Sequence, residues 1–94
     1  MNNMIFEGQG YPNSETSYFV YILKMNNEKH YVGFSKDLLK RLEKHHKGYV
    51  PYTKPLRPLK LVTYIVFHDK YKAIAFEKYL KSGSGRAFMK KRLV

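Results

Sequence analysis

Apolar residues in this chain gather in three short runs that polar turns separate. Residues 18–24 (YFVYILK) are aromatic or branched and lack polar alternation, which predicts a strand covered on both faces. Residues 30–34 and 61–67 predict two further strands. The short polar link at Asn26 and Asn27 makes the first two strands a hairpin.

Apolar residues at helical spacing predict three helices after the hairpin. Ser35 or Asp37 is placed to cap the first of them, and Gly48 is placed to end it. Residues 71–81 predict the second helix. A Ser-Gly-Ser-Gly stretch then breaks the chain, and residues 86–93 predict a short, strongly basic third helix.

Together these elements predict one α/β domain with the order β-β-α-β-α-α. The segment 49–60 contains three prolines, so we expect an extended loop there and no helix. Residues 1–17 are rich in turn formers without periodicity, which predicts a flexible N-terminal arm. The domain itself is therefore expected to span residues 18–94.

The net charge of +11 in 94 residues adds a functional signal to this fold prediction. Eight basic residues between positions 36 and 60 face only two acidic ones, and no acidic residue follows Glu77. Solubility alone would explain a basic protein, but this clustering favours a polyanionic partner. We expect DNA, with RNA as an alternative, ahead of a membrane surface or an acidic protein partner.

Cysteine is absent, which excludes disulfides and thiolate metal sites. No apolar run approaches the roughly 20 residues of a membrane-spanning helix. The N-terminal residues lack the basic-then-apolar order of a signal peptide. We therefore expect a cytoplasmic monomer with no membrane partner.

The length of the hairpin loop decides where Tyr21 and Tyr31 point. A two-residue loop would pair Ile22 with Tyr31 and put the two tyrosines on opposite faces of the sheet. A loop of three or five residues would put both tyrosines on one face. A shared chemical role for the two phenols requires this second arrangement.

Glu77 is the most informative single residue, because it falls within the apolar stripe of the second predicted helix. A carboxylate in such a place pairs with a cation, binds a metal or keeps its proton. One alternative is a salt bridge to Arg41 or to a lysine that pins the second helix to the first. The other is a metal ligand, since one carboxylate plus waters suffices for Mg²⁺ when substrate phosphate completes the shell.

Tyr21, Tyr31, Arg41 and His45 each have a structural alternative. Strand tyrosines and helix histidines are most often packed in the core, and a helix arginine is most often solvated. As functional groups, a phenol near a cation could orient or deprotonate a water. Arg41 lies beside the apolar stripe of its helix, where its guanidinium could grip a phosphate. His45 follows it by one helical turn.

The order of these groups resembles a known family. The triplet around Tyr21 (VYI) is followed about ten residues later by a triplet that begins at Tyr31 and ends at Gly33 (YVG). Arg41 comes eight residues after Gly33, and Glu77 lies on a later helix. This order is similar to the GIY-YIG nuclease domain, and most of all to its small stand-alone bacterial members, over nearly all of the chain except the arm.

The resemblance implies a small three-stranded antiparallel sheet flanked by helices. It also implies cleavage of DNA phosphodiester bonds with one divalent ion, Mg²⁺ or Mn²⁺. By motif position, Glu77 would hold the metal, Tyr21 and Tyr31 would be the motif tyrosines, and Arg41 would bind the phosphate. His45 occupies a position near the site where some members also have a histidine. Which tyrosine activates the water stays open.

A second set of residues is expected to contact nucleic acid, through cations or through a close approach of the backbone. The set is Gly33, Lys36, Lys40, Lys44, Lys54, Arg57 and Arg86. Without a second recognition domain we expect structure-selective or weakly specific cleavage, in DNA repair or processing. The alternatives are a nucleic-acid-binding module without cleavage activity and a subunit that docks on another protein through its basic helix.

Overall fold

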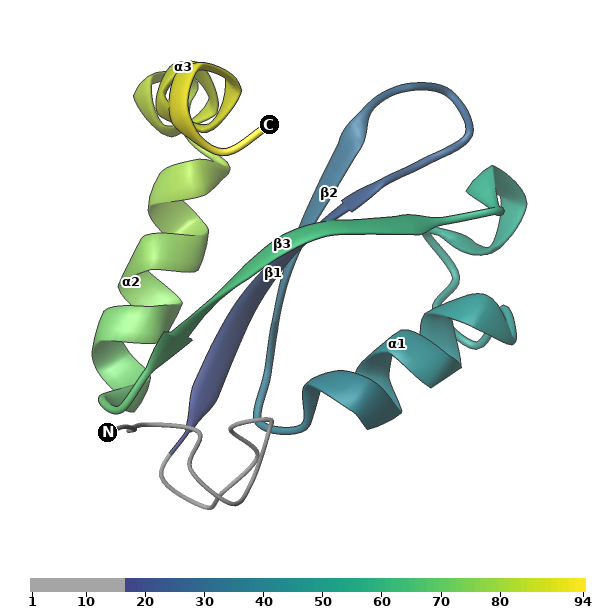
Figure 1. The fold of residues 1–94 in the computed structure, drawn as a ribbon, viewed down its shortest axis with the longest axis horizontal. Helices are drawn as coiled ribbons and strands as arrows, with labels where there is room; N and C mark the ends of the chain where they lie inside the picture. Colours follow the sequence, from purple (N-terminus) through teal and green to yellow (C-terminus); the bar gives the residue numbers. More distant parts are fainter. Residues whose placement is uncertain (1–16) are drawn as a thin grey trace, which may run out of the picture.

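The computed structural model describes residues 17–94, and these form a three-stranded antiparallel sheet with three α-helices (Figure 1). The elements are β1 (Tyr18–Lys24), β2 (His30–Ser35), α1 (Leu38–His46), β3 (Lys60–Phe67), α2 (Lys70–Leu80) and α3 (Gly83–Arg92). The predicted α/β class and the order β-β-α-β-α-α are confirmed. The predicted N-terminal arm, apart from Ser17, lies outside the described residues.

The strands are arranged in the order β2-β1-β3, so β1 is central and β2 is an edge strand. Lys24 pairs with His30, which leaves a five-residue link in the hairpin. This register pairs Tyr21 with Gly33 and Leu23 with Tyr31. Side chains of opposed residues share a face, so Tyr21 and Tyr31 lie on the same face of the sheet, as their shared role requires.

The central strand is buried on both sides because helices cover both faces of the sheet. Figure 1 shows α1 on one side of the strands and α2 with α3 on the other. The core on the α1 face consists of Phe19, Tyr21, Leu23, Met25, Leu38 and Leu59. The core on the opposite face consists of Val20, Ile22, Val32, Ala73, Leu80 and Met89. The alternation of these two sets along β1 explains why this strand reads as a continuous apolar run.

Asp37 and not Ser35 caps α1, because its side chain accepts a hydrogen bond from the Lys40 amide at 3.1 Å. At the other end, Gly48 adopts a φ of +80°, a conformation that glycine tolerates best. The Arg57 guanidinium packs against this glycine and donates to the carbonyl oxygen of His46 at 3.0 Å. Arg57 therefore closes the C-terminal end of α1.

Two sequence-based expectations are wrong in detail. The segment 49–60 is not wholly extended, because a single 3₁₀ turn forms at Lys54–Leu56, with proline at its start as short helices tolerate. The Ser-Gly-Ser-Gly stretch does not separate two helices by a loop. Ser82 caps α3 by accepting from the Gly85 amide at 3.1 Å, so the helix already begins at Gly83.

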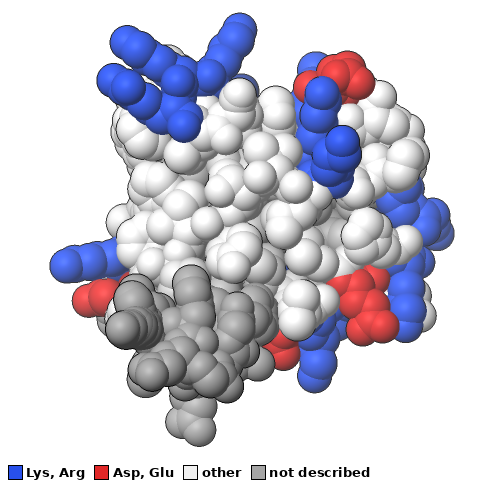
Figure 2. Space-filling model, in the orientation of Figure 1, with Lys and Arg blue, Asp and Glu red and all other residues white. Residues whose placement is uncertain are grey.

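Charge is unevenly spread over the surface. Figure 2 shows lysine and arginine side chains gathered over α3 and along the side formed by α1, with an uncharged area between them. Within the described residues, no helix is long and apolar enough to cross a membrane.

Candidate active site

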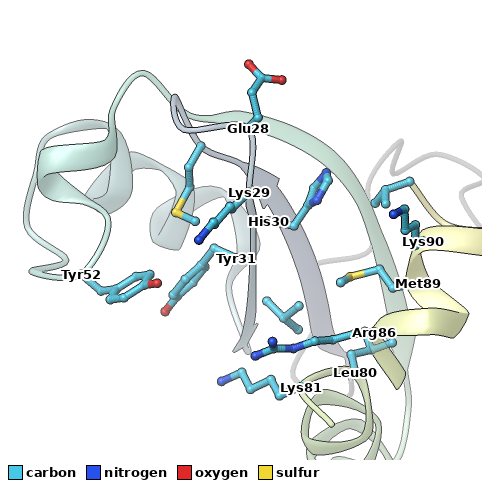
Figure 3. Close-up of a pocket in the computed structure, with 13 residues that line it drawn as sticks. Glu28, Lys29, His30, Tyr31, Tyr52, Leu80, Lys81, Arg86, Met89 and Lys90 are labelled. Atoms are coloured by element: carbon cyan, nitrogen blue, oxygen red, sulfur yellow. The ribbon is translucent and has the colours of Figure 1, made fainter. Parts of the chain in front are cut away.

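A pocket of about 760 Å³ lies beside the edge strand β2 (Figure 3). Tyr31 and Tyr52 form one wall, and Lys81 and Arg86 from the α2–α3 region approach from the other. The candidate catalytic residues Tyr21, Arg41, His45 and Glu77 do not line this pocket. Tyr31 links the two regions, because its ring lies 5.2 Å from the ring of His45 and 5.8 Å from the ring of Tyr52.

Tyr21 is the centre of the candidate site. Its side chain is fully buried, and its phenol tip lies over Gly33 on β2. Any side chain at position 33 would collide with the ring and hydroxyl of Tyr21. The observed role of Gly33 is therefore to make room for this phenol at the edge of the sheet, and its contact with a nucleic-acid backbone stays a prediction.

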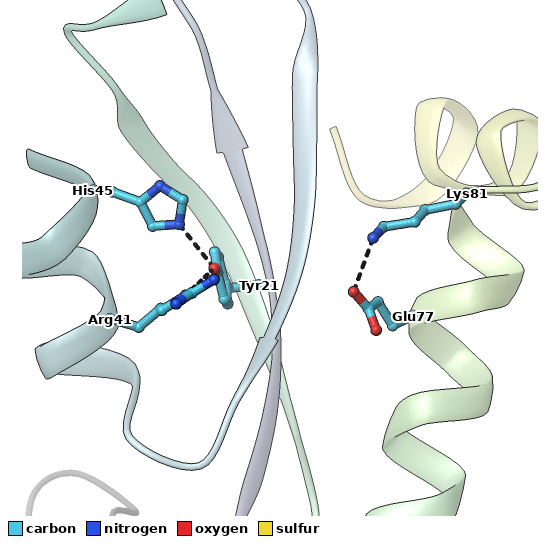
Figure 4. Close-up of polar contacts among 5 residues, drawn as sticks. All are labelled: Tyr21, Arg41, His45, Glu77 and Lys81. Atoms are coloured by element: carbon cyan, nitrogen blue, oxygen red, sulfur yellow. Dashed lines mark hydrogen bonds and ion pairs between the residues drawn. The ribbon is translucent and has the colours of Figure 1, made fainter. Parts of the chain in front are cut away.

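The Tyr21 hydroxyl joins two side chains of α1 (Figure 4). It accepts a hydrogen bond from Arg41 Nε at 3.2 Å and lies 2.8 Å from His45 Nε2. His45 Nδ1 lies 2.8 Å from Thr53 Oγ1, and the Thr53 hydroxyl points at the carbonyl oxygen of Val50 at 3.4 Å. Arg41, Tyr21, His45 and Thr53 thus form one continuous hydrogen-bonded chain.

The direction of this chain follows from its last member. A threonine hydroxyl has one proton, and the Val50 carbonyl can only accept it. With the Thr53 hydroxyl donating to Val50, Thr53 Oγ1 accepts from His45 Nδ1–H, which leaves Nε2 unprotonated. The Tyr21 O–H therefore donates to His45 Nε2, while its oxygen accepts from Arg41.

Electrostatics fix the protonation states at neutral pH. Burial raises the pKa of Tyr21 to about 12; the hydrogen bond from Arg41 opposes this, while Tyr31 and Glu77 add to it. Burial lowers the pKa of His45 from 6.5 to about 4, and the neighbouring Arg41 and His46 act in the same direction. The phenol and the histidine behind it are thus both neutral, and the low pKa of His45 makes its imidazole a weak base.

Arg41 is partly buried, and its guanidinium interacts with both phenols. The Tyr21 hydroxyl raises the pKa of Arg41 most strongly, and Tyr31 adds to the effect. A guanidinium has five N–H donors, and the Nε–H that Tyr21 uses is only one of them. Arg41 therefore retains donors for an anion beside Tyr21.

Glu77 approaches from the other face of the sheet, because α2 covers the face opposite α1 (Figure 4). It is near enough for its charge to contribute to the raised pKa of Tyr21. Its side chain is 20% exposed, and its carboxylate pairs with Lys81 at 2.9 Å. The expected salt bridge to a lysine exists, but it joins residues of one helical segment and does not pin α2 to α1.

The site offers a divalent ion one carboxylate, that of Glu77. The described residues contain no group of three or more His, Cys, Asp or Glu side chains that could enclose a metal. A half-buried single carboxylate fits a hard ion that keeps most of its waters and takes phosphate oxygens as further ligands. Glu77 is the residue that would hold such an ion, and its ion pair with Lys81 would have to break.

The candidate nucleic-acid contacts fall into separate groups. Lys36, Lys40 and Lys44 are exposed on or next to α1, and Lys54 is exposed on the 3₁₀ turn. Arg57 already donates to two backbone carbonyls, and Arg86 lines the pocket. Contact of each with nucleic acid stays a prediction.

Sequence reasoning missed Thr53, Tyr52 and Lys81. Thr53 and Tyr52 lie in the proline-containing segment, whose folded path could not be read from periodicity. The spacing of Glu77 and Lys81 did carry a signal, because residues four apart on a helix are neighbours.

Comparison with known proteins identifies the domain. A family model described as the GIY-YIG catalytic domain matches residues 17–92. The chain belongs to the GIY-YIG family. UPF0213 proteins of Staphylococcus aureus strains Mu50 and N315 are each 39% identical to it over 67 residues, which cover 70% of this chain and 82% of theirs.

A solved structure agrees with this assignment. The solution NMR structure of the UPF0213 protein BH0048 from Bacillus halodurans has a TM-score of 0.53 and 28% identity, and covers 80% of this chain and 83% of that one. The resemblance to small stand-alone bacterial GIY-YIG members is confirmed. The protein is thus an endonuclease-like domain of a nuclease superfamily.

Proposed function

We propose that this GIY-YIG protein is a metal-dependent endonuclease that hydrolyses DNA phosphodiester bonds. It acts in DNA repair or processing and selects DNA structure more than sequence. The observation that carries the proposal is the chain from Arg41 through Tyr21 to His45, in which the Tyr21 phenol lies over Gly33 of the edge strand and near enough to Glu77 for its charge to act. Any buried tyrosine needs an acceptor for its O–H, so the feature that packing alone does not require is the Arg41 guanidinium at the same hydroxyl.

Tyr21 activates the attacking water in this proposal. Its oxygen takes a proton from the water while its own proton passes to His45 Nε2, so the phenol itself stays neutral. This coupling matters because a pKa of about 12 makes a free phenolate inaccessible at neutral pH. His45 is neutral beforehand, so the lone pair on Nε2 is available for that proton, although its low pKa makes the transfer costly. The hydrogen bond to Thr53 keeps the histidine in the required tautomer.

Arg41 binds a non-bridging phosphate oxygen and offsets the charge that develops on phosphate. A divalent ion on Glu77 supplies Lewis-acid polarisation of the phosphate. Lys81 holds the Glu77 carboxylate in its absence. Tyr31 lies at the rim, where its ring packs on His45 and keeps water away from the imidazole.

The test is a nicking assay on nicked, branched and single-stranded DNA with Mg²⁺ or Mn²⁺, comparing wild type with Glu77→Gln. We expect the variant to lose roughly a hundredfold or more in rate, since the ion supplies several kcal/mol of stabilisation to the transition state. Glu43→Gln is the matched control, because Glu43 also pairs with a lysine four residues on, Lys47, at 3.1 Å.

Equal binding of DNA by wild type and Glu77→Gln, with no cleavage of any substrate by either, would establish the alternative of a binding module. The salt bridge between Glu77 and Lys81 is the observation that favours this alternative. Cleavage by Glu77→Gln at the wild-type rate would contradict the metal-ligand role.

A further inference from the structure

The pocket beside β2 has features that hydrolysis by Tyr21 and Glu77 does not require. We call it the basic groove and define it by the side chains that carry its chemistry. They are Lys29, Tyr31, Tyr52, Lys81, Arg86 and Lys90.

An aromatic ledge forms one wall of the basic groove. The rings of Tyr31 and Tyr52 stack with centroids 5.8 Å apart and an interplanar angle of 29°. Tyr52 is 64% exposed, so only one face of its ring is used by Tyr31. An ordered, exposed ring with a free face is a platform for another planar group.

The rest of the basic groove is positively charged. Figure 3 shows Lys29 beside Tyr31, and Arg86 and Lys81 extending from the opposite wall toward the aromatic ledge. One acidic residue, Glu28, also borders the pocket, but it points away from it and pairs with Lys24 at 2.9 Å. Cations around an aromatic platform match a strand of alternating phosphates and bases.

We propose that the basic groove binds an unpaired segment of a DNA strand, with one base stacked on Tyr52 and the neighbouring phosphates on Lys29, Lys81 and Arg86. Bases in a duplex have both faces covered by their neighbours, so only an unpaired base can lie flat on the ledge. This proposal rests on the proposed function and deepens it, because the Tyr31 ring contacts both Tyr52 in the groove and His45 in the hydrogen-bonded chain.

The geometry also couples the basic groove to the metal site. Lys81 lines the groove and at the same time pairs with Glu77. A phosphate in the groove competes with the carboxylate for the lysine ammonium, which frees Glu77 for a divalent ion. A strand in the groove should therefore strengthen binding of Mn²⁺, and Mn²⁺ should strengthen binding of the strand to the same extent.

The test measures binding by fluorescence anisotropy with a labelled oligothymidine and with a blunt duplex of equal length. We expect Tyr52→Ala to weaken oligothymidine binding roughly five- to a hundredfold, the range for loss of one base–aromatic stack. Tyr52→Phe should retain it. Tyr71→Ala is the matched control, because Tyr71 is 79% exposed on α2 and does not line the groove.

A second readout locates the base directly. Irradiation of an oligonucleotide that contains 5-iodouracil should crosslink it to Tyr52, and mass spectrometry identifies the modified residue. Equal oligothymidine binding by wild type and Tyr52→Ala would overturn the inference, as would equal weakening of blunt-duplex binding. Both measurements are made without divalent ions, so they are independent of cleavage and of the outcome for Glu77→Gln.

Discussion

At the residue scale, His45 is the unusual group of this domain. It is fully buried and neutral, held between Tyr21 and Thr53, although the protein carries a net charge of +11. A charged imidazole is strongly disfavoured in this place, so His45 carries the proton of the proposed reaction only transiently. The proton acceptor that the proposed reaction needs is therefore also a source of acid sensitivity for the fold.

The depressed pKa of His45 predicts how stability depends on pH. Its folded-state pKa of about 4 lies below its usual 6.5, so the unfolded chain binds more protons between these values. The stabilisation is complete above pH 6.5 and is lost as the pH falls toward 4. We expect the free energy of unfolding, from urea titrations, to fall by on the order of 1–3 kcal/mol over this range through His45 alone.

The comparison with variants isolates this effect. His45→Gln should be less stable at neutral pH and should lack this part of the slope. His46→Gln, which changes an exposed neighbour on the same helix, should keep it. A His45→Gln profile parallel to that of wild type would show that His45 does not titrate in this way.

At the element scale, the sheet places groups from both of its faces at one edge. The Tyr21 phenol reaches that edge because β2 has Gly33, without a side chain, where the phenol crosses the strand. Helix α2 places Glu77 on the opposite face of the sheet. The position of α2 in turn depends on α3, which packs across its end. A side chain at Gly85 would collide with the backbone of Tyr79 and Leu80.

Two glycines of α3 predict opposite effects of the same substitution. Gly85→Ala should destabilise the protein by about 1–3 kcal/mol, because the helices cannot approach as closely. Gly83→Ala has open space around its Cβ position and should be neutral or stabilising by up to about 1 kcal/mol, since alanine favours the helix. Thermal unfolding measures both. A Gly85→Ala protein as stable as wild type would show that this contact is not tight.

Much of this arrangement could be predicted from the sequence. The continuous apolar run of β1 predicted burial on both faces. The position of Glu77 in an apolar stripe predicted a carboxylate that is paired, bound to a cation or protonated, and the structure shows a pair with Lys81. The hydrogen bond of Thr53 to His45 could not be predicted, because it depends on the path of a loop without periodicity. The pocket could not be predicted either, since its walls come from segments that meet only in the folded chain.

At the scale of the whole molecule, the positive charge frames the site on two sides. Exposed lysines lie on or next to α1, Arg86 and Lys90 of α3 line the pocket beside β2, and the candidate site lies between these two helices at the β2 edge of the sheet. A polyanion that spans both groups would cross the edge strand next to Tyr21. Charge would then steer DNA toward the site without reading its sequence.

This distribution predicts a steep dependence of DNA binding on salt. The logarithm of the association constant for duplex DNA should fall linearly with the logarithm of salt concentration, with a slope near −0.9 for each phosphate contacted. Replacing Lys40 and Lys44 together by glutamine should make the slope about two units shallower on the same principle. Binding that is insensitive to salt would instead favour docking on a protein partner.

The most direct test of the central claim is the rate constant of metal-dependent nicking by Tyr21→Phe, measured beside Tyr64→Phe. Tyr64 is the register partner of Tyr21 on β3 and packs on Phe19, so its variant controls for loss of a phenol hydroxyl near the same core. We predict that Tyr21→Phe loses roughly 10²–10⁴ in rate, as expected for removal of a general base, while Tyr64→Phe cleaves like wild type. Cleavage by a folded Tyr21→Phe protein at the wild-type rate would contradict the account.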